Sequence, residues 1–381
     1  MKLITSEAVS IGHPDNVADQ ISDAMLDACL KKDEKSRVAV ETMVTTNTVF
    51  MAGEVTTHAD VDISSLVRNL VKDIGYDFDG FNYDNLTITS HIHRQSPDIA
   101  MGVDRDGAGD QGMMFGYAVN SPETRYLPVQ YYYAQRLIGF FQNARRFGDQ
   151  WCMDNLRPDA KTQITYDKDT DKMKTIVISH QHVEGMKMDE FQKNCTRIIR
   201  NAIPDKYLDQ IVFLNHNDKY DINDSKTFVF LNPTGQFVEG GPAADTGLTG
   251  RKIIVDTYGG EGRIGGGCFS GKDPSKVDRS AAYMCRHVAK NLVAKGMCEK
   301  AEVAVAYAIG VAQPVQIMVD SFGTGDDKAL TDYVVENWDF RPKAIIEEFD
   351  LTRPGDHWRY EWTACNGHFT NPNFPWEDIV D

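Results

Sequence analysis

Two periods of apolar residues alternate along the chain, one typical of strands and one typical of helices. Residues 38–44 (VAVETMV) and 48–55 (TVFMAGEV) alternate or run apolar on either side of a Thr-Asn turn, which predicts a β-hairpin. Apolar runs predict five more strands, at residues 175–180, 227–231, 251–257, 303–309 and 315–321.

Apolar residues spaced about four apart predict amphipathic helices between these strands. The helices are expected after Pro14 (with Val17, Ile21, Met25 and Cys29), over Phe191 to Ala202 and ending before Pro204, over Val277 to Val288, and after Pro342. Together the two patterns predict repeated units of β-hairpin plus helix. The fold class is therefore α+β, with helices on one face of each sheet.

The length of the chain indicates more than one domain. Domains usually hold about 100–150 residues, so 381 residues predict two or three of them. Breaks are expected near the glycine- and acid-rich stretch 102–112 and near Asn232-Pro233-Thr234-Gly235.

Composition narrows the class of protein. Hydrophobic residues make up 41% and charged residues 25%, which is typical of a soluble globular protein. Residues 1–14 lack the apolar core of a signal peptide, and no stretch approaches the roughly 20 apolar residues of a membrane helix. The 7 cysteines are dispersed without CxxC spacing. This predicts reduced thiols, a cytoplasmic location, no membrane partner and no zinc site.

Charge gives the first indication of a binding site. The net charge of −16 argues against nucleic acid as a partner. Residues 251–279, however, hold six cations and four anions, and the segment is rich in glycine. A basic island in an acidic chain indicates a site for phosphate, although a solvated surface patch is the alternative.

Two glycine patterns in the chain resemble well-known nucleotide motifs and fail on context. Residues 107–112 fit GxGxxG, but the preceding Asp104-Arg105-Asp106 are not a buried strand, as a dinucleotide fold requires. Residues 266–273 nearly fit a phosphate-binding loop, but Asp273 stands where Ser or Thr would hold magnesium.

The second segment still has properties that suit phosphate. Glycine backbone can approach an anion closely, and Lys272 and Lys276 add positive charge at the start of a helix. Asp278 follows in the first turn of that helix, where it could hold a cation such as Mg²⁺. An acid in this position could equally serve only to stabilise the helix, and the pattern does not decide between the two.

The N-terminal stretch Gly12-His13-Pro14-Asp15 immediately precedes a predicted helix. Pro14 suits the first helical position, so His13 is expected near the cap and Asp15 in the first turn. A histidine and an acid at a helix start could contact a phosphate directly and through a metal. A purely structural histidine at a turn is the alternative.

Taken together, segments along the whole chain resemble the S-adenosylmethionine synthetase family, also called the methionine adenosyltransferases. The matching segments are residues 5–7, 12–15, 19–24, 107–112, 114–118, 157–161, 232–235, 247–252, 271–280, 367–369 and 374–377. They occur in the order of the family, so the resemblance is specific.

The resemblance implies three similar domains in a pseudo-threefold arrangement, at residues 1–101, 107–232 and 233–381. It implies synthesis of S-adenosylmethionine from ATP, L-methionine and water, with release of phosphate and diphosphate. It also implies two Mg²⁺ per site, a K⁺ ion, and a homodimer or homotetramer with active sites between subunits.

Roles follow at the matching positions. His13, Lys161, Arg251 and Lys272 would be catalytic. ATP would be bound by these four together with Asp159, Gln236, Phe237, Asp245, Lys252 and Cys268. Methionine would be bound by Glu54, Gln95, Asp110, Asp245 and Lys276. Asp15 and Asp278 would bind Mg²⁺, and Glu41 would mark the K⁺ site.

The chain departs from the family at a few of these places. Asn16 stands where a Lys is usual, Gln236 replaces a common Arg, and Ile264 replaces a common His. The segment 98–107, a mobile loop over the site in the family, is shorter than usual. Two rival interpretations are a tripolyphosphatase that lost adenosyl transfer and a catalytically impaired homologue that acts as a structural or regulatory subunit.

Overall fold

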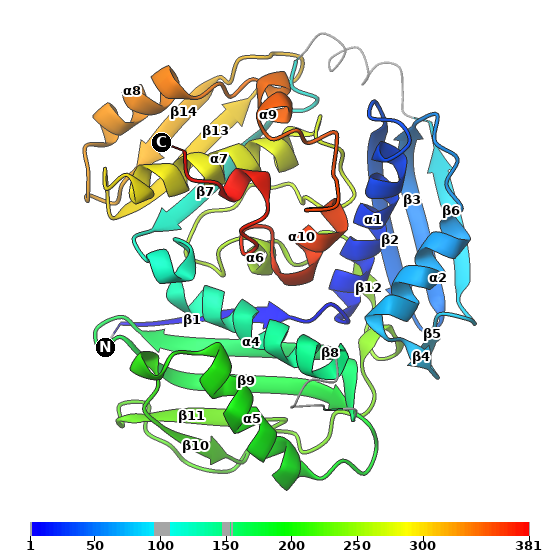
Figure 1. Ribbon diagram of the computed structural model, residues 1–381, viewed down its shortest axis with the longest axis vertical. Helices are drawn as coiled ribbons and strands as arrows, with labels where there is room; N and C mark the ends of the chain where they lie inside the picture. Colours follow the sequence, from blue (N-terminus) through cyan, green and yellow to red (C-terminus); the bar gives the residue numbers. More distant parts are fainter. Residues whose placement is uncertain (1, 95–106, 147–152, 154, 381) are drawn as a thin grey trace.

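A computed structural model describes residues 2–94, 107–146, 153 and 155–380 of the chain. Three units, each a β-sheet with helices packed against it, surround helices α6 (Ile253–Asp256) and α10 (Tyr360–Asn366) (Figure 1). The prediction of an α+β fold built from three similar sheet-and-helix units in a pseudo-threefold arrangement is confirmed.

The first sheet has the strand order β12-β2-β3-β6, and α1 packs against β2. Its elements are β2 (Arg37–Thr45), β3 (Thr48–Thr56), β6 (Thr87–His93), β12 (Gly247–Leu248), α1 (Pro14–Leu30) and α2 (Ile63–Ile74). A small hairpin of β4 (Asp77–Phe78) and β5 (Phe81–Asn82) follows α2. Along β2, buried residues alternate with more exposed ones, so one face of this strand packs on α1 and the other does not.

The second sheet has the order β1-β8-β9-β11-β10, with antiparallel pairs up to β9 and parallel pairs beyond it. Helix α4 packs against β8 and β1 and also contacts α5. The elements are β1 (Leu3–Val9), β8 (Leu156–Asp167), β9 (Lys172–His182), β10 (Gln210–Leu214), β11 (Lys226–Leu231), α4 (Val129–Arg146) and α5 (Met188–Ala202).

The third sheet has the order β14-β13-β7 and is antiparallel throughout, with α7 packed against β7 and β13. Its elements are β7 (Gly112–Val119), β13 (Lys300–Tyr307), β14 (Gln316–Asp320), α7 (Val277–Ala294), α8 (Asp327–Asn337) and α9 (Pro342–Glu348). Four 3₁₀ turns complete the described elements, at Pro122–Thr124, Asp205–Tyr207, Gly241–Ala243 and Pro375–Glu377.

The sheets exchange segments that are distant in the sequence. Strand β1, from the start of the chain, pairs with β8 of the second sheet, whereas β12 pairs with β2 of the first. Strand β7 pairs with β13 of the third sheet. The apolar side chains of all three units join in one continuous buried core. Where the domains divide along the chain stays a prediction.

Most of the predicted elements are present, and one is wrong. The 38–44/48–55 hairpin is β2 and β3, and the helices predicted after Pro14 and Pro342 are α1 and α9. Residues 251–257, however, do not form the predicted strand. Residues 253–256 form the short helix α6, with Ile254 about half exposed and Asp256 buried. A short apolar run cannot by itself distinguish a strand from a turn of helix.

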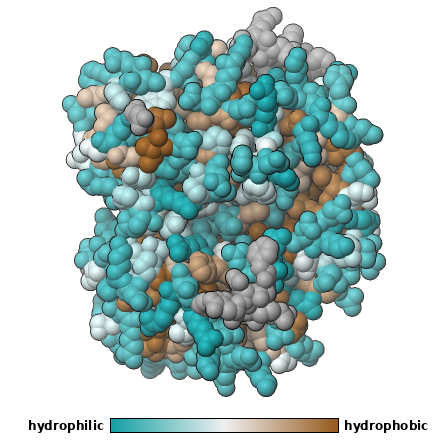
Figure 2. All heavy atoms as spheres, viewed as in Figure 1, coloured by the Kyte–Doolittle hydropathy of each residue, from teal (hydrophilic) through white to brown (hydrophobic). Residues whose placement is uncertain are grey.

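The rejection of the two nucleotide motifs agrees with the structure. Residues 107–112 lead into strand β7, whereas the dinucleotide motif leads into a helix. The surface on the side shown in Figure 2 is largely hydrophilic, with smaller hydrophobic areas between. In the described residues, no helix combines the length and the apolar composition needed to cross a bilayer.

Candidate active site

His13 is the N-cap of α1, as the sequence predicts, and its buried ring lies among cations. Its Nδ1 atom accepts a hydrogen bond from the backbone N–H of Asp15 at 3.2 Å. Burial, which has the largest effect, and the positive charges of Lys252 and Lys161 together lower the pKa of His13 to about 3. The ring is therefore neutral near pH 7, and its proton resides on Nε2, which can donate a hydrogen bond.

Asp15 joins this histidine to the segment that follows β12. One carboxylate oxygen accepts the backbone N–H of Leu248 at 3.0 Å, and the other lies 2.5 Å from Lys252 Nζ. Arg251 Nε lies 3.6 Å from the first oxygen. Burial acts to raise the pKa of Asp15, but the hydrogen bonds from Lys252 and Leu248 outweigh it and hold the pKa below its usual value.

Lys161 and Asp159 approach the same place from strand β8. Lys161 pairs with Val9 of β1, just ahead of His13, and its charge acts on the His13 ring. One oxygen of Asp159 accepts the N–H of Gly241 at 2.8 Å, while the other is buried without a hydrogen-bond partner in the described chain. Burial raises the pKa of Asp159 to about 6, although Lys161 opposes the shift, and the negative charge of Asp245 adds to it.

These contacts define the histidine group: His13, Asp15, Asp159, Lys161, Arg251 and Lys252. It gathers three cations and one neutral imidazole around two carboxyl groups. Such a set can bind a polyanion, because a neutral N–H donor and several cations converge in one place on a chain that is acidic overall.

The glycine-rich segment before α7 carries the second set of cations. Lys272 Nζ lies 2.7 Å from Asp278, in the first turn of α7, and Lys276 Nζ lies 2.5 Å from the fully buried Asp273. A side chain at Gly267 would collide with the Asp278 carboxylate, so glycine is needed there for the close approach. Asp273, which replaces the Ser or Thr of a standard phosphate loop, also accepts the Val38 N–H at 2.7 Å and is part of the framework.

A cavity of about 280 Å³ brings Lys272 together with Glu41, Glu54 and Cys268. Glu41 and Glu54 point from the face of β2 and β3 opposite to α1, where Glu41 pairs with Ala52 and Glu54 with Ala39. We call these residues the sheet-face group. No hydrogen bond or ion pair links its side chains to the histidine group within the described ranges.

Of the remaining predicted residues, Asp245 adjoins the histidine group, because its charge acts on Asp159. Phe237 donates its N–H to His182 Nε2 at 3.1 Å in the loop after β11, next to Gln236. Asp110 is on the segment before β7, and its carboxylate accepts the N–H of Gln111 at 2.7 Å. Glu54 also lies 3.3 Å from His93 Nε2. Gln95 and most of the 98–107 segment lie outside the described residues.

Sequence reasoning missed the residues that hold both cationic segments in place. Asp19 accepts the N–H of Gly250, and Asp23 accepts the N–H of Gly271, each at 2.8 Å. The signal was available, since aspartates recur every four residues along α1, at 15, 19, 23 and 27. That spacing puts all four on one side of a helix.

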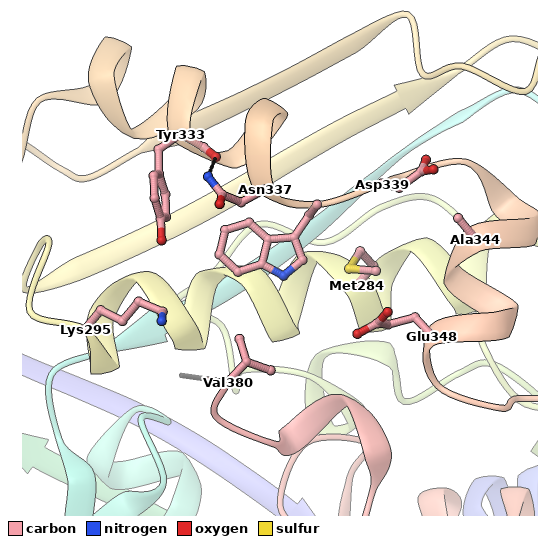
Figure 3. A pocket seen from close by; sticks show the side chains of 9 residues that line it. Met284, Lys295, Tyr333, Asn337, Asp339, Ala344, Glu348 and Val380 are labelled. Atoms are coloured by element: carbon pink, nitrogen blue, oxygen red, sulfur yellow. Dashed lines mark hydrogen bonds between the residues drawn. The ribbon is translucent and has the colours of Figure 1, made fainter.

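A separate hollow contains none of the predicted residues. It lies among α7, α8, α9 and the C-terminal segment, and Lys295, Tyr333, Glu348 and Met284 point into it (Figure 3). Asn337 Nδ2 donates to the Tyr333 carbonyl at 2.7 Å. This hollow is therefore not part of the candidate site.

Fold and site define a three-unit α+β protein that concentrates cations for a polyanionic ligand. Three family models match the chain, described as the N-terminal, central and C-terminal domains of S-adenosylmethionine synthetase, over residues 1–97, 105–237 and 239–378. The chain belongs to the S-adenosylmethionine synthetase family.

Relatives named S-adenosylmethionine synthase are similar over almost their whole length. The protein of Akkermansia muciniphila is 47% identical over 398 residues, which cover 99% of this chain and 95% of the relative. That of Thermus thermophilus is 47% identical over 402 residues, with 99% and 96% covered. That of Desulfosudis oleivorans is 49% identical over 393 residues, with 98% and 95% covered.

Proposed function

We propose that this chain is a methionine adenosyltransferase, which converts ATP, L-methionine and water to S-adenosylmethionine, phosphate and diphosphate. The observation that carries the proposal is the histidine group, where a neutral His13 lies among Lys161, Arg251 and Lys252. Full-length similarity to proteins named S-adenosylmethionine synthase supports the same reaction. No observation favours the impaired homologue or the tripolyphosphatase.

The reaction needs stabilisation of a leaving group more than activation of a nucleophile. The methionine sulfur forms a bond to C5′ with its own lone pair, and the C5′–O bond breaks with both electrons going to the tripolyphosphate. No proton has to be removed from the sulfur. Cations and N–H donors placed where negative charge develops lower the barrier, and Lys161, Arg251, Lys252, Lys272 and His13 Nε2–H would fill this role. Water then cleaves the retained tripolyphosphate.

Two carboxylates, Asp15 of the histidine group and Asp278 beside Lys272, suit Mg²⁺ held jointly with a substrate. Within the described ranges, no three His, Cys, Asp or Glu side chains gather closely enough to hold a metal alone. Mg²⁺ commonly uses one or two carboxylates together with substrate phosphates, and Asp15 and Asp278 would supply these for two ions. When bound, Mg²⁺ neutralises phosphate charge. Glu41, an exposed carboxylate beside the sheet-face cavity, would offer oxygen to K⁺.

Methionine would be bound beside the sheet-face cavity. Glu54 lines that cavity with an anionic group suited to the ammonium of an amino acid. Asp110, Asp245, Gln95 and Lys276 would complete the methionine site. Asp159, Gln236, Phe237 and Cys268 would contact the nucleotide.

We further propose a homodimer, or a tetramer of two dimers, with active sites between subunits. Glu41 and Glu54 lie on a face of the first sheet that α1 does not cover. On the third sheet, Met113 in β7 exposes 50% of its surface, and Val315, just before β14, exposes 63%. A second subunit placed on such a face would bury apolar area and could bring its own cations to the cavity.

The proposal is tested by incubating the protein with ATP, L-methionine, Mg²⁺ and K⁺ and measuring S-adenosylmethionine by mass spectrometry. Product is expected with the wild type. Lys272→Ala should form it roughly 100–1000 times more slowly, because one contact to the developing charge is lost. Tripolyphosphate hydrolysis without S-adenosylmethionine formation would favour the tripolyphosphatase instead.

A further inference from the structure

Helix α1 has a line of four aspartates that hold segments distant in the sequence. Asp15, Asp19 and Asp23 accept the backbone N–H groups of Leu248, Gly250 and Gly271. Asp27 accepts those of Tyr360 and Glu361, at the start of α10. One helix therefore fixes the segment with Arg251 and Lys252, the segment with Lys272, and a helix at the centre of the molecule.

Among the described residues, Asp19 differs from its two neighbours because it forms no ion pair. Asp15 pairs with Lys252, and Asp23 forms a double hydrogen bond to Arg279 at 2.6 and 2.8 Å. Asp19 uses only Oδ1, which accepts the Gly250 N–H. Its Oδ2 atom is buried and has no hydrogen-bond partner in the part of the chain that the structure describes, and only 1% of the residue is exposed.

The residues before Gly250 are held by the pairing of β12 with β2 and by the Thr249 N–H, which donates to the Thr42 carbonyl at 3.0 Å, whereas Gly250 itself is held by Asp19. Its φ is +79°, and a side chain at this position would collide with Cys268, so the residue must be glycine. Arg251, which follows directly, is half exposed. The Asp19 bond is thus a fixed point immediately before the cations of the histidine group.

The charged surroundings of Asp19 disfavour ionisation. Asp15 and Asp23 flank it on α1, Asp256 faces it from α6, and Arg279 of α7 and Lys252 are the cations nearby. Burial raises the pKa of Asp19 to about 8, and the two flanking aspartates add to the shift. A neutral carboxyl still accepts one N–H through its carbonyl oxygen, and it avoids the cost of an unpaired buried charge.

We propose that Asp19 is a positioning residue that holds the Arg251–Lys252 segment through the hydrogen bond that its carboxyl accepts from the Gly250 N–H. The inference rests on the proposed function for the statement that these cations act on a polyphosphate. The inference predicts that turnover and tripolyphosphate binding depend on the hydrogen-bond acceptor at residue 19 and not on its negative charge.

The test compares Asp19→Asn and Asp19→Ala with Asp27→Ala. Asn keeps a carbonyl acceptor of the same size without a charge, whereas Ala removes the acceptor. Asp27→Ala is the matched control, because it deletes a carboxyl from the same helix that accepts backbone N–H groups away from the cations. The measurements are kcat and KM for S-adenosylmethionine synthesis, calorimetric binding of inorganic tripolyphosphate, urea stability, and hydrogen exchange of residues 247–252.

Asp19→Asn should retain wild-type kcat and tripolyphosphate affinity. Asp19→Ala should lower kcat by roughly 10–100-fold, as expected for cations displaced by about 1 Å, and should speed exchange at residues 247–252. Asp27→Ala should be less stable than the wild type. Its kcat should be unchanged, and hydrogen exchange at residues 247–252 should stay as slow as in the wild type. Retained kcat in Asp27→Ala separates positioning from a general loss of stability.

Three outcomes would overturn the inference. An Asp19→Asn variant that folds but has a strongly reduced kcat would make the negative charge essential. This result decides the question even where Asp19→Ala does not fold. If Asp19→Ala and Asp27→Ala have the same kcat and the same hydrogen exchange at residues 247–252, Asp19 has only a structural role. If the wild type makes no S-adenosylmethionine, the proposed function fails. In that case, weaker tripolyphosphate binding in Asp19→Ala alone would still support a positioning role for Asp19. Unchanged binding would reject that role.

Discussion

His13 illustrates how position converts an ordinary side chain into a functional one. As the N-cap of α1, its ring accepts the Asp15 N–H and is buried beside Lys161 and Lys252. These surroundings favour a neutral ring with a donor at Nε2, which can approach a phosphate chain without a protonation step.

The first prediction concerns pH. The folded-state pKa of His13 is lowered to about 3 from 6.5, so the unfolded chain binds a proton at this residue over a pH range where the folded chain does not. Stability should therefore fall as pH decreases from 6.5 toward 3. His13→Asn, which keeps a capping side chain, should show a smaller loss over the same range in urea unfolding.

The matching measurement is the NMR titration of the His13 ring. We expect no protonation of this ring between pH 7 and 5 in the native protein. The pH dependence of turnover should therefore show no ionisation that belongs to His13 in that range. A His13 ring that titrates near its ordinary value would contradict the account of its surroundings.

The second prediction concerns Asn16, which replaces a Lys usual in the family. Asn16 is buried in the first turn of α1, and its Oδ1 atom has no hydrogen-bond partner among the described residues. An amide cannot neutralise phosphate charge, so we expect release of some tripolyphosphate before it is cleaved. Asn16→Lys should lower the tripolyphosphate released per S-adenosylmethionine, and the uncharged Asn16→Met should not.

The ratio is measured by ion chromatography of the polyphosphate against S-adenosylmethionine. No detectable tripolyphosphate from the wild type, with no change in Asn16→Lys, would make Asn16 a neutral replacement.

At the residue scale, local contacts could be predicted from the sequence and distant ones could not. The cap at His13 and the first-turn position of Asp15 follow from Pro14 alone, because helix starts have a local signature. The contact of Asp15 with Lys252 joins residues 237 positions apart, and no local pattern encodes it. The same holds for the hydrogen bond from Gly250 to Asp19.

At the scale of elements, α1 is the framework of the site. Its aspartates fix two cationic segments, and its apolar side packs on β2. The helix is buried on nearly all sides, so its aspartates accept hydrogen bonds from other segments of the chain.

The third prediction follows from the Asp23–Arg279 pair. Both side chains are completely buried, and removing Asp23 leaves the Arg279 guanidinium without its counter-charge. Asp23→Ala should lower the free energy of unfolding by about 3–5 kcal/mol, measured by urea denaturation. The exposed pair Lys328–Asp332 is the control, and Asp332→Ala should leave stability unchanged within error. Equal effects of the two variants would show that the buried pair has no special role.

Element prediction succeeded where the periodicity was regular and failed where site residues interrupt it. The α1 and α7 stripes and the β2–β3 hairpin were clear. Strand β8 was missed because it contains Pro158, Asp159 and Lys161, and its pairing with β9 is irregular between Leu156 and Ala160. Residues 251–257 were misassigned for the opposite reason, since their apolar run is a short helix with Ile254 facing outward.

At the scale of the whole molecule, the two groups of predicted residues are neighbours, since Cys268 lies against Gly250, but no hydrogen bond or ion pair joins them within the described residues. The histidine group is built around the start of α1, whereas Glu41, Glu54 and Lys272 line a cavity on the open sheet face. A site shared between two subunits would combine the groups, and no pattern in a single sequence could place one subunit on another.

The fourth prediction is therefore complementation. Lys161→Ala, from the histidine group, and Lys272→Ala, from the sheet-face group, should each be nearly inactive alone. After mixing and subunit exchange, mixed dimers would contain one site with both lysines intact, and activity should return. Mixing Lys161→Ala with a second variant of the same group, Lys252→Ala, should restore nothing. A fully active monomer in sedimentation would contradict the shared site.

The central claim, that ATP is attacked at C5′ and not at a phosphorus atom, is tested most directly with an oxygen label. ATP carrying ¹⁸O in the bridging C5′–O position is incubated with the protein, L-methionine, Mg²⁺ and K⁺, and the products are analysed by mass spectrometry. Attack by sulfur on C5′ predicts that the label leaves entirely with the tripolyphosphate or its phosphate and diphosphate products, in an amount equal to the S-adenosylmethionine formed. Label that stays on adenosine or an adenine nucleotide would mean that the P–O bonds are cleaved, and the account would be wrong.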